Sequence, residues 1–447
     1  MAEQNQPKSL KRQLGMTGAI ALGLGSIVGT GVFVSLGLAA GVAGPSVIIG
    51  LAIAAFVATC NGLNSAQLAA NHPVSGGAYE YGYRYLNPWL GFTAGWMFLI
   101  AKSASAATAA LGFAGYLLNL LGISAARGYL VPIALAAVVI LTGLILLGIR
   151  RSNIVNIGIV SITLLSLVFF ILAGLPLVVE AGFDNFTPFV LANGETPDGL
   201  AEGLGAVLQA TALMFVAYTG YGRIATLGEE VREPSQTIPR AIITTLILTM
   251  TLYMGVAIVG IGSVGAETLG NVTREEVAPL EVAARNFAVP GSAVILAIGA
   301  VTATLGVLLN LILGLSRVLL AMGRRDDMPS VVARVRESGS TTTPYMAILV
   351  MGGAIAALVL IGDVRITWSF SAFTVLIYYA LTDLSALQIP DEDRLYPKWI
   401  AWAGLMSCLF LAFWVDQQIW LVGLGLIAAG LLWRLAIRNL SAKYSQD

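Results

Sequence analysis

Long apolar runs constrain this chain more than any other feature of its sequence. A helix needs about 20 mainly apolar residues, within a range of about 17–25, to cross the hydrocarbon core of a bilayer. Runs of that length recur through all 447 residues and predict twelve spanning helices. They cover residues 16–38, 45–69, 90–121, 129–149, 153–178, 201–228, 241–263, 292–322, 344–361, 366–388, 398–414 and 418–437.

The composition agrees with a chain whose surface faces lipid. Hydrophobic residues make up 57% of the sequence and charged residues only 11%, whereas soluble domains carry roughly 25% charged residues. The net charge is zero, without the basic stripe that binding to phosphate groups requires. We therefore predict an all-α membrane protein with membrane lipid as a partner and no nucleic-acid partner.

The inventory of reactive side chains argues against an enzyme or a metal protein. Cys60 and Cys408 both lie inside apolar runs, and His72 has no histidine or cysteine neighbour in the sequence. The sequence contains no P-loop and no Ser–His pair within a span. We expect no catalytic residue, no metal and no cofactor.

The lysines and arginines predict how the chain is oriented, because cytoplasmic loops are enriched in them. If the N-terminus is cytoplasmic and the spans alternate, the outer side holds only Arg127, Arg274, Arg285 and Arg365 of the 24 basic residues. No signal-peptide cleavage site follows the polar start of the chain. We predict a multi-pass protein of the plasma (inner) membrane with both termini cytoplasmic. The outer stretch 274–287 is either a short surface helix or a plain loop.

Two spans are rich in glycine and are predicted to be interrupted. The first contains four glycines within Gly23–Gly31, and the sixth contains two within Phe215–Gly222. Each glycine costs a helix about 1 kcal/mol relative to alanine. A broken backbone in lipid is tolerated only where it is buried in protein or lines a cavity. Close packing of small residues between helices is the alternative explanation for these glycines.

The spacing of the two breaks favours a binding site. They lie five spans apart, and transporters built from inverted repeats have discontinuous helices at corresponding places that meet near the middle of the membrane. The free N–H groups that begin a half-helix attract a carboxylate, and free carbonyl groups attract an ammonium group. An amino acid presents both charges on one carbon atom, so paired breaks predict a site for a zwitterion.

Four motifs in this sequence resemble those of the amino acid–polyamine–organocation permeases. The first-span motif is Gly25–Phe33, and the loop after the second span has Pro73–Tyr79. The loop after the sixth span has Glu229–Arg240, and the eighth span ends with Arg317 and then Met322–Pro329. The order and spacing match over roughly residues 13–395.

This resemblance implies a fold of two inverted five-helix repeats, with discontinuous helices 1 and 6 and two extra C-terminal helices. It implies transport of amino acids. The expected parts are a cytoplasmic tail at 1–15, the two repeats at 16–180 and 201–390, the extra helices at 398–438 and a second cytoplasmic tail at 439–447.

The resemblance also implies a substrate site, carried over by position. N–H groups around Thr30 and Gly31 would hold the carboxylate, and Ser26 and Gly29 are predicted to belong to the same site. Carbonyl groups of Ile27, Val216 and Thr219 would hold the amine. Phe215 and Tyr218 would border the side-chain pocket or the gate, although buried aromatic residues are more often simple packing.

The substrate is expected to be neutral. Relatives that carry cations often have a carboxylate just after the sixth-span break or in the middle of the third span, where this chain has Gly222 and Ala101–Lys102. The carboxylates of Glu202, Glu229 and Asp383 lie towards the ends of spans. No carboxylate deep in a span is therefore expected to bind a second ammonium group.

The coupling ion is left open between a proton and sodium, with uncoupled exchange as a further possibility. Lys102 is a charged residue inside a span, and such residues are functional by default. It is the candidate for proton coupling or for attracting an acidic substrate, and snorkelling or pairing with a carbonyl group is the structural alternative. Thr163 with Thr302 or Thr304 would supply hydroxyl groups to sodium, although such hydroxyls usually bond back to their own helix. A transporter-like amino acid sensor is a further alternative.

An inner gate is a separate hypothesis. Glu229 and Glu230 lie in one predicted cytoplasmic loop with Arg240, and Arg317 lies at the foot of the eighth span. These residues are able to form ion pairs that close the cytoplasmic side.

Overall fold

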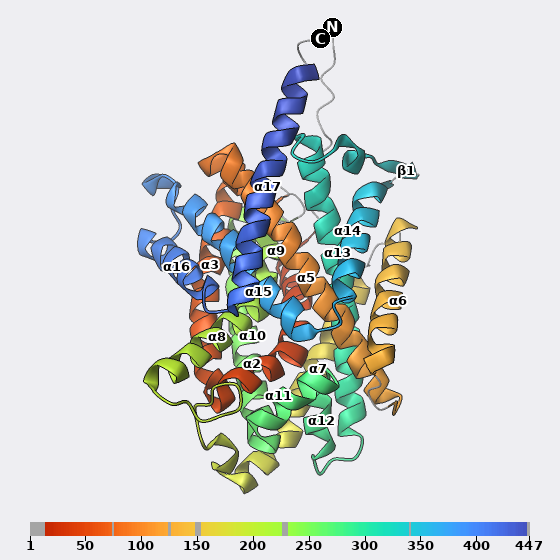
Figure 1. The fold of residues 1–447 in the computed structure, drawn as a ribbon, viewed down its shortest axis with the longest axis vertical. Coiled ribbons are helices and arrows are strands. Elements are labelled where there is room, and N and C mark those ends of the chain that lie inside the picture. The colour runs from red at the N-terminus through yellow and green to blue at the C-terminus, as the bar shows by residue number, and fades with distance from the viewer. Residues whose placement is uncertain are drawn as a thin grey trace.

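The computed structural model describes residues 14–73, 76–123, 127–147, 153–225, 231–338 and 341–444. Helices dominate and run mostly along one long axis (Figure 1). The principal ones are α1 (Met16–Ile27), α2 (Leu36–Ala43), α3 (Val47–Asn71), α5 (Pro88–Leu120), α6 (Arg127–Leu146), α7 (Asn153–Ala181), α8 (Leu200–Tyr218), α9 (Gly222–Ala225), α10 (Pro234–Val264), α13 (Ser292–Arg324), α14 (Tyr345–Val359), α15 (Val364–Leu387), α16 (Lys398–Ala412) and α17 (Gln417–Tyr444).

Helix length and composition confirm the all-helical membrane class. Within the described residues, nine helical segments are long and apolar enough to cross a membrane. The first of these, Met16–Asn71, covers two of the predicted spans, and α14 and α16 are shorter apolar helices. Each predicted run overlaps an observed helix, or two half-helices in the first and sixth spans. Most bounds agree within a few residues, but α10 begins seven residues earlier than predicted and α17 ends seven residues later. The total of twelve spans stays a prediction.

The connections differ more from expectation than the spans do. Where one short surface helix or a loop was expected, the chain forms α11 (Ala266–Glu275) and α12 (Pro279–Arg285). A small antiparallel hairpin, β1 (Arg336–Ser338) with β2 (Thr341–Thr343), was not predicted. The helices α11 and α12 lie beside α2 at one end of the molecule, and the hairpin lies at the other end (Figure 1).

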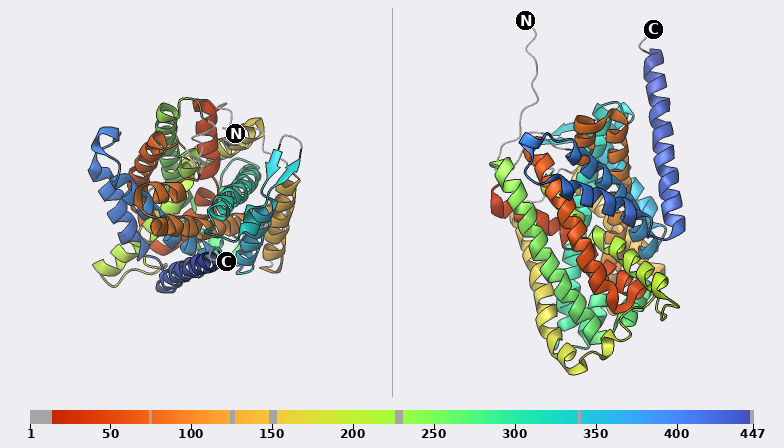
Figure 2. Two further views of the ribbon diagram at one scale, coloured as in Figure 1. Left: turned by 90° about the horizontal axis from the view of Figure 1, so that it is seen from above. Right: turned by 90° about the vertical axis from the view of Figure 1, so that its left-hand side faces the viewer.

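Burial divides the helices into an inner and an outer set. The most apolar stretch of α5 is 83% buried, and this helix packs against α13 and α15. The corresponding stretch of α17 is only 17% buried, and α17 stands at the periphery (Figure 2). Exposed apolar side chains such as Ile140 and Leu172 cover the outer helices. A large apolar exterior is what a lipid-facing surface requires.

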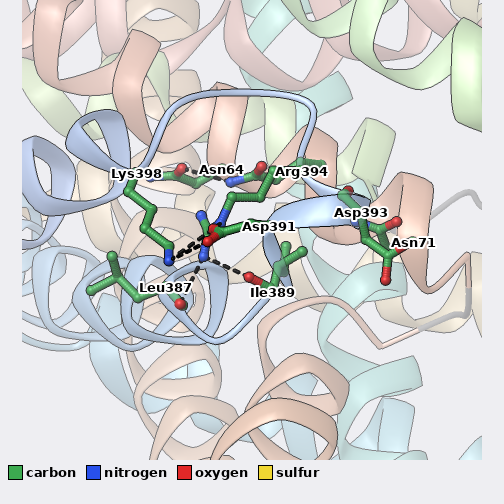
Figure 3. A network of polar contacts seen from close by, with 9 residues as sticks. Asn64, Asn71, Leu387, Ile389, Asp391, Asp393, Arg394 and Lys398 are labelled. Atoms are coloured by element: carbon green, nitrogen blue, oxygen red, sulfur yellow. Dashed lines mark hydrogen bonds and ion pairs between the residues drawn. The ribbon is translucent and has the colours of Figure 1, made fainter.

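The connection from α15 to α16 is held by a polar network (Figure 3). Arg394 donates to the carbonyl oxygens of Leu387 and Ile389, both at 2.7 Å. Its guanidinium thereby satisfies the last carbonyl group of α15 and one in the turn that follows the helix. The carboxylate of Asp391 accepts hydrogen bonds from Arg394 and Lys398. The network fixes where α15 ends and how α16 begins.

A second network joins α17 to the rest of the bundle. The side chains of Arg434 and Asp327 are only 5% and 7% exposed, with Nη2 and Oδ1 3.5 Å apart. The hydroxyl groups of Tyr79 and Tyr83 both donate to Oδ2 of Asp327. The Arg434 guanidinium also lies 5.1 Å from the centre of the Phe92 ring. The buried pair of Arg434 and Asp327 therefore anchors α17, a helix that is otherwise largely exposed.

Replacing Asp327 with asparagine is expected to lower the stability of the protein by about 3 kcal/mol or more, because breaking a buried ion pair leaves the remaining charge uncompensated. Thermal unfolding in detergent measures the change. Asp326 is the adjacent, exposed aspartate, so Asp326→Asn is the matched control and should unfold at the wild-type temperature. Equal unfolding temperatures for both variants would mean that the pair does not anchor α17.

Candidate functional site

The first span is interrupted where the glycine cluster predicts it. The α1 helix ends at Ile27, and the N–H of Val28 bonds back to Leu24 at 2.8 Å. Helical bonding then restarts from the carbonyl of Gly29 and continues through a π-helical turn, η1 (Gly31–Ser35), into α2. The first N–H groups of a helical segment have no acceptor within that segment. The interruption therefore leaves free donors at the start of the second half-helix.

The hydroxyl group of Thr30 lies at this interruption. Thr30 is 3% exposed, and in the described part of the chain its Oγ1 atom has no hydrogen-bond partner. Buried polar groups are normally hydrogen-bonded. An unpaired hydroxyl beside free N–H groups marks a place where a polar ligand would be stabilised.

The sixth span is interrupted at the corresponding place. The α8 helix ends at Tyr218, and a 3-10 turn, η5 (Thr219–Tyr221), joins it to α9. A 3-10 segment in the middle of a helix often marks a hinge. The hydroxyl of Tyr379, on α15, donates to the carbonyl of Thr219 at 3.0 Å. A side chain from another helix thus satisfies a carbonyl group at the break.

The two interrupted segments touch each other through their backbones. A Cβ atom on Gly220 would lie 2.3 Å from the carbonyl oxygen of Ser26 and 2.5 Å from the nitrogen of Ile27. A Cβ atom on Gly31 would lie 2.6 Å from the Cβ atom of Ala217. Only glycine permits this approach. The glycines therefore allow the contact between the breaks as well as the breaks themselves.

A tyrosine on α10 bridges the two breaks, and the sequence reasoning missed it. The Tyr253 hydroxyl donates to the carbonyl of Ile27 at 2.8 Å and lies 3.4 Å from the carbonyl of Ala217. The Ile27 carbonyl is one of those expected to hold a substrate amine. A carbonyl oxygen has two lone pairs, so this bond leaves it able to accept a second hydrogen bond.

Phe215 and Tyr218, which were predicted to border the substrate, lie beside the breaks and make packing contacts. The Phe215 ring meets the ring of Tyr379 edge to face, with centres 5.7 Å apart. The Tyr218 ring packs against Tyr253 at 5.3 Å. Both are buried, as is Val216. A role for either ring at the border of a substrate stays a prediction.

Lys102 reaches the break in the sixth span. Its Nζ atom donates to Oγ1 of Thr219 at 3.0 Å and lies 5.8 Å from the centre of the Tyr378 ring, on α15. The residue is 8% exposed, and within the described residues no carboxylate forms an ion pair with it. Lys102 is the only charged residue within α5, and it contacts Thr219, a residue predicted to bind the substrate amine.

The three threonines proposed for sodium are not brought together. A small cavity of about 10 Å³ lies beside the first break and is lined by Thr163 and Ala303, among others. This is about the space that one water molecule needs. Thr302 and Thr304 do not line it, and both bond back to carbonyl groups of their own helix. Adjacent helical residues point about 100° apart, so the alanine between them faces the cavity instead.

The proposed inner gate is described only in part. Glu229 and Glu230 lie outside the described residues. Arg240 and Arg317 are both exposed at the surface.

Comparison with known proteins assigns the chain to a family. Residues 18–439 match the amino acid permease family. An uncharacterised transporter of Mycobacterium tuberculosis is 37% identical over 428 residues, which cover 95% of this chain and 91% of that protein. The branched-chain amino acid permease BcaP of Bacillus subtilis is 29% identical over 95% of this chain and 93% of its own length. The vacuolar cationic amino acid transporter 4 of Arabidopsis thaliana is 27% identical over 81% of this chain and 61% of its own length.

These relatives are transporters and not enzymes, and the resemblance drawn from the four motifs is confirmed. The chain belongs to the amino acid permease family, within the amino acid–polyamine–organocation superfamily, and is a multi-pass membrane protein.

Proposed function

We propose that this permease is a secondary transporter that moves a neutral amino acid across the plasma membrane by alternating access. The contact between the interrupted first and sixth spans is the observation that carries the proposal. The N–H groups of Thr30 and Gly31 would bind the substrate carboxylate, because the start of a half-helix carries partial positive charge. Carbonyl groups of Ile27, Val216 and Thr219 would bind the amine.

The proposed movement follows from the proposed topology. The interrupted helices are the first of each five-helix repeat, at 16–180 and 201–390. In transporters with inverted repeats, one set of helices rocks against the other around a site at the repeat interface. We place both termini in the cytoplasm on the basis of the lysine and arginine distribution.

The preference for a neutral substrate follows from the charge at the site. The Lys102 ammonium is hydrogen-bonded to Thr219, so a substrate with a second ammonium group would meet a like charge in a poorly solvated place. Like charges repel strongly where the effective dielectric constant is low. The same ammonium is able to attract an acidic side chain, which is the competing specificity.

Lys102 also provides a means of coupling. The substrate amine and the Lys102 ammonium would both bind near Thr219, so the protonation of Lys102 changes the affinity for substrate. Linkage then requires that substrate binding changes the affinity of Lys102 for its proton by the same factor. This reciprocity is the requirement for proton-coupled transport.

Sodium coupling is the second candidate, and one observation favours it. The small cavity beside the first break is lined by Thr163, whose hydroxyl is an oxygen ligand. The Thr163 hydroxyl donates to the carbonyl of Ile159, which leaves its lone pairs available to a cation.

Uptake by purified protein in liposomes tests the proposal. A panel of labelled amino acids is offered with a proton gradient, a sodium gradient or neither, and with or without internal amino acid. We expect a neutral amino acid to accumulate with the proton gradient or to exchange without one. Uptake that requires sodium would support the cavity beside Thr163 instead. Transport of none of the amino acids would contradict the proposal.

A further inference from the structure

A further ionisable residue, besides Lys102 and the Arg434–Asp327 pair, is buried in the bundle. Asp383 lies on the last part of α15 and is 0% exposed. The amide nitrogen of Asn64, on α3, donates to its Oδ1 atom at 2.8 Å. Within the described residues its Oδ2 atom has no hydrogen-bond partner. The carboxyl group therefore has one neutral donor and one unpaired oxygen.

Two neighbouring helices seal this carboxyl group. A Cβ atom on Gly404, in α16, would lie 2.7 Å from Oδ2 of Asp383, so the α16 backbone lies directly against the carboxyl. On α3, Gln67 donates to Asn64 at 3.2 Å, and its own Oε1 atom has no partner in the described part of the chain. The surroundings thus hold two acceptor oxygens that have no hydrogen-bond partner in the described part of the chain.

No cation compensates the carboxyl group among the described residues. The titratable groups that interact electrostatically with it come from four elements: Cys60 on α3, Cys408 on α16, Tyr221 on η5 and Tyr379 on α15. Thiols and phenols are ordinarily neutral near pH 7. The nearby cation of the α15–α16 connection, Arg394, is bound to two carbonyl groups and to Asp391 (Figure 3).

Burial of this kind decides the charge of the group. An isolated ionised carboxylate is very costly in an apolar environment, and such a group takes up a proton instead. A protonated Asp383 has a hydroxyl hydrogen that can satisfy an acceptor. The deprotonated form requires water to enter or the surrounding helices to separate.

We propose that the Asp383 carboxyl group binds and releases a proton during the transport cycle, as a proton site additional to Lys102. The proposal rests on the proposed function. In the conformation described here the carboxyl group is sealed and protonated. Loss of the proton favours a conformation in which α15 moves away from α3 and α16 and water reaches the carboxylate.

The same face of α15 connects this site to the break in the sixth span. Tyr379 lies four residues before Asp383, which places both on one side of the helix. Its hydroxyl donates to the carbonyl of Thr219, the residue whose hydroxyl accepts from Lys102. A shift of α15 that hydrates Asp383 therefore changes a hydrogen bond at the proposed substrate site. This contact makes protonation and substrate binding interdependent.

Infrared spectroscopy on purified protein in lipid tests the protonation directly. We expect the wild-type protein at neutral pH to show the carbonyl band of a buried protonated carboxylic acid, which Asp383→Asn should lack. Glu392 is exposed in the loop after α15, so Glu392→Gln is the control and should keep the band. Retention of the full band in Asp383→Asn would overturn the proposal. This measurement is independent of any transport activity.

Transport assays in liposomes test the role of the proton. We expect Asp383→Asn to lose proton-driven accumulation and to retain exchange of internal for external amino acid, which requires no net proton movement. The retained exchange shows that the variant is folded. Full proton-driven accumulation by Asp383→Asn would overturn the proposal while leaving the proposed function intact. Failure of the wild-type protein to transport any amino acid would instead contradict the proposed function, and the infrared result would still decide the protonation of Asp383.

Discussion

Gly220→Ala is expected to lower transport by roughly tenfold or more. The added methyl group would lie 2.3 Å from the Ser26 carbonyl oxygen and 2.4 Å from its carbon. Both are backbone atoms, so the two interrupted segments must move apart to accommodate it. Inserting a methyl group into a packed site costs about 1–3 kcal/mol, and about 1.4 kcal/mol corresponds to a factor of ten.

The control for this variant is an exposed glycine within another span. Gly158, on α7, has no atom within 4 Å of the position that a Cβ would occupy. Gly158→Ala should transport like the wild type and gain slightly in stability, because alanine favours a helix by about 1 kcal/mol over glycine. Uptake of labelled amino acid into liposomes measures both variants. Equal uptake by the two would mean that close contact between the breaks is not needed for transport.

Replacing Lys102 with methionine should abolish proton-driven accumulation and leave exchange in place. Methionine retains much of the length of the lysine side chain but removes the ammonium group that donates to Thr219. The site then has no ammonium group beside Thr219, so the proton gradient loses the group on which we expect it to act there. Accumulation with and without a proton gradient measures this loss.

The control is the same substitution at an exposed lysine. The Lys398 side chain is 53% exposed and pairs with Asp391 at the surface, so Lys398→Met should leave coupling unchanged. Full gradient-driven uptake by Lys102→Met would end the coupling proposal. A changed preference for acidic amino acids, with coupling retained, would assign Lys102 to substrate selection instead.

The sequence alone predicts the helices and the two breaks well. Apolar length is a direct requirement of the bilayer, so the predicted spans overlap the observed helices, and most bounds agree within a few residues. The polar ends of α10 and α17 extend beyond the apolar runs and were not predicted. Glycine clusters lower helix stability locally, and both predicted interruptions are present, at Val28–Gly29 and Thr219–Tyr221. Lys102 was identified because a charge inside a span is costly, and its position at the sixth-span break agrees with that reasoning.

The partners of these groups could not be predicted, because they depend on how helices are rotated and packed. Tyr253 and Tyr379 resemble ordinary packing residues in the sequence, and only the fold places their hydroxyl groups on carbonyl groups at the breaks. Thr302 and Thr304 have suitable chemistry but face away from the cavity that Ala303 lines. Adjacent residues of a helix point about 100° apart. An alignment of spans that is uncertain by one residue therefore cannot decide which side chain faces the cavity.

The burial of Asp383 is a second feature that could not be predicted from the sequence. Its position towards the end of a span was correctly assigned from the sequence, and water normally reaches such residues. Its complete burial depends on the close approach of Gly404 in α16, and no local pattern in the sequence reports that contact.

The position of a bound amino acid, determined in a structure of the complex, decides whether the two breaks form the substrate site. We expect the substrate to lie between the two interrupted helices, with its carboxylate within about 2.7–3.2 Å of the N–H groups of Thr30 and Gly31. Its amine should face the carbonyl groups of Ile27 and Thr219. A substrate bound elsewhere in the bundle, with Gly220 still packed against Ser26, would show that the breaks do not bind it.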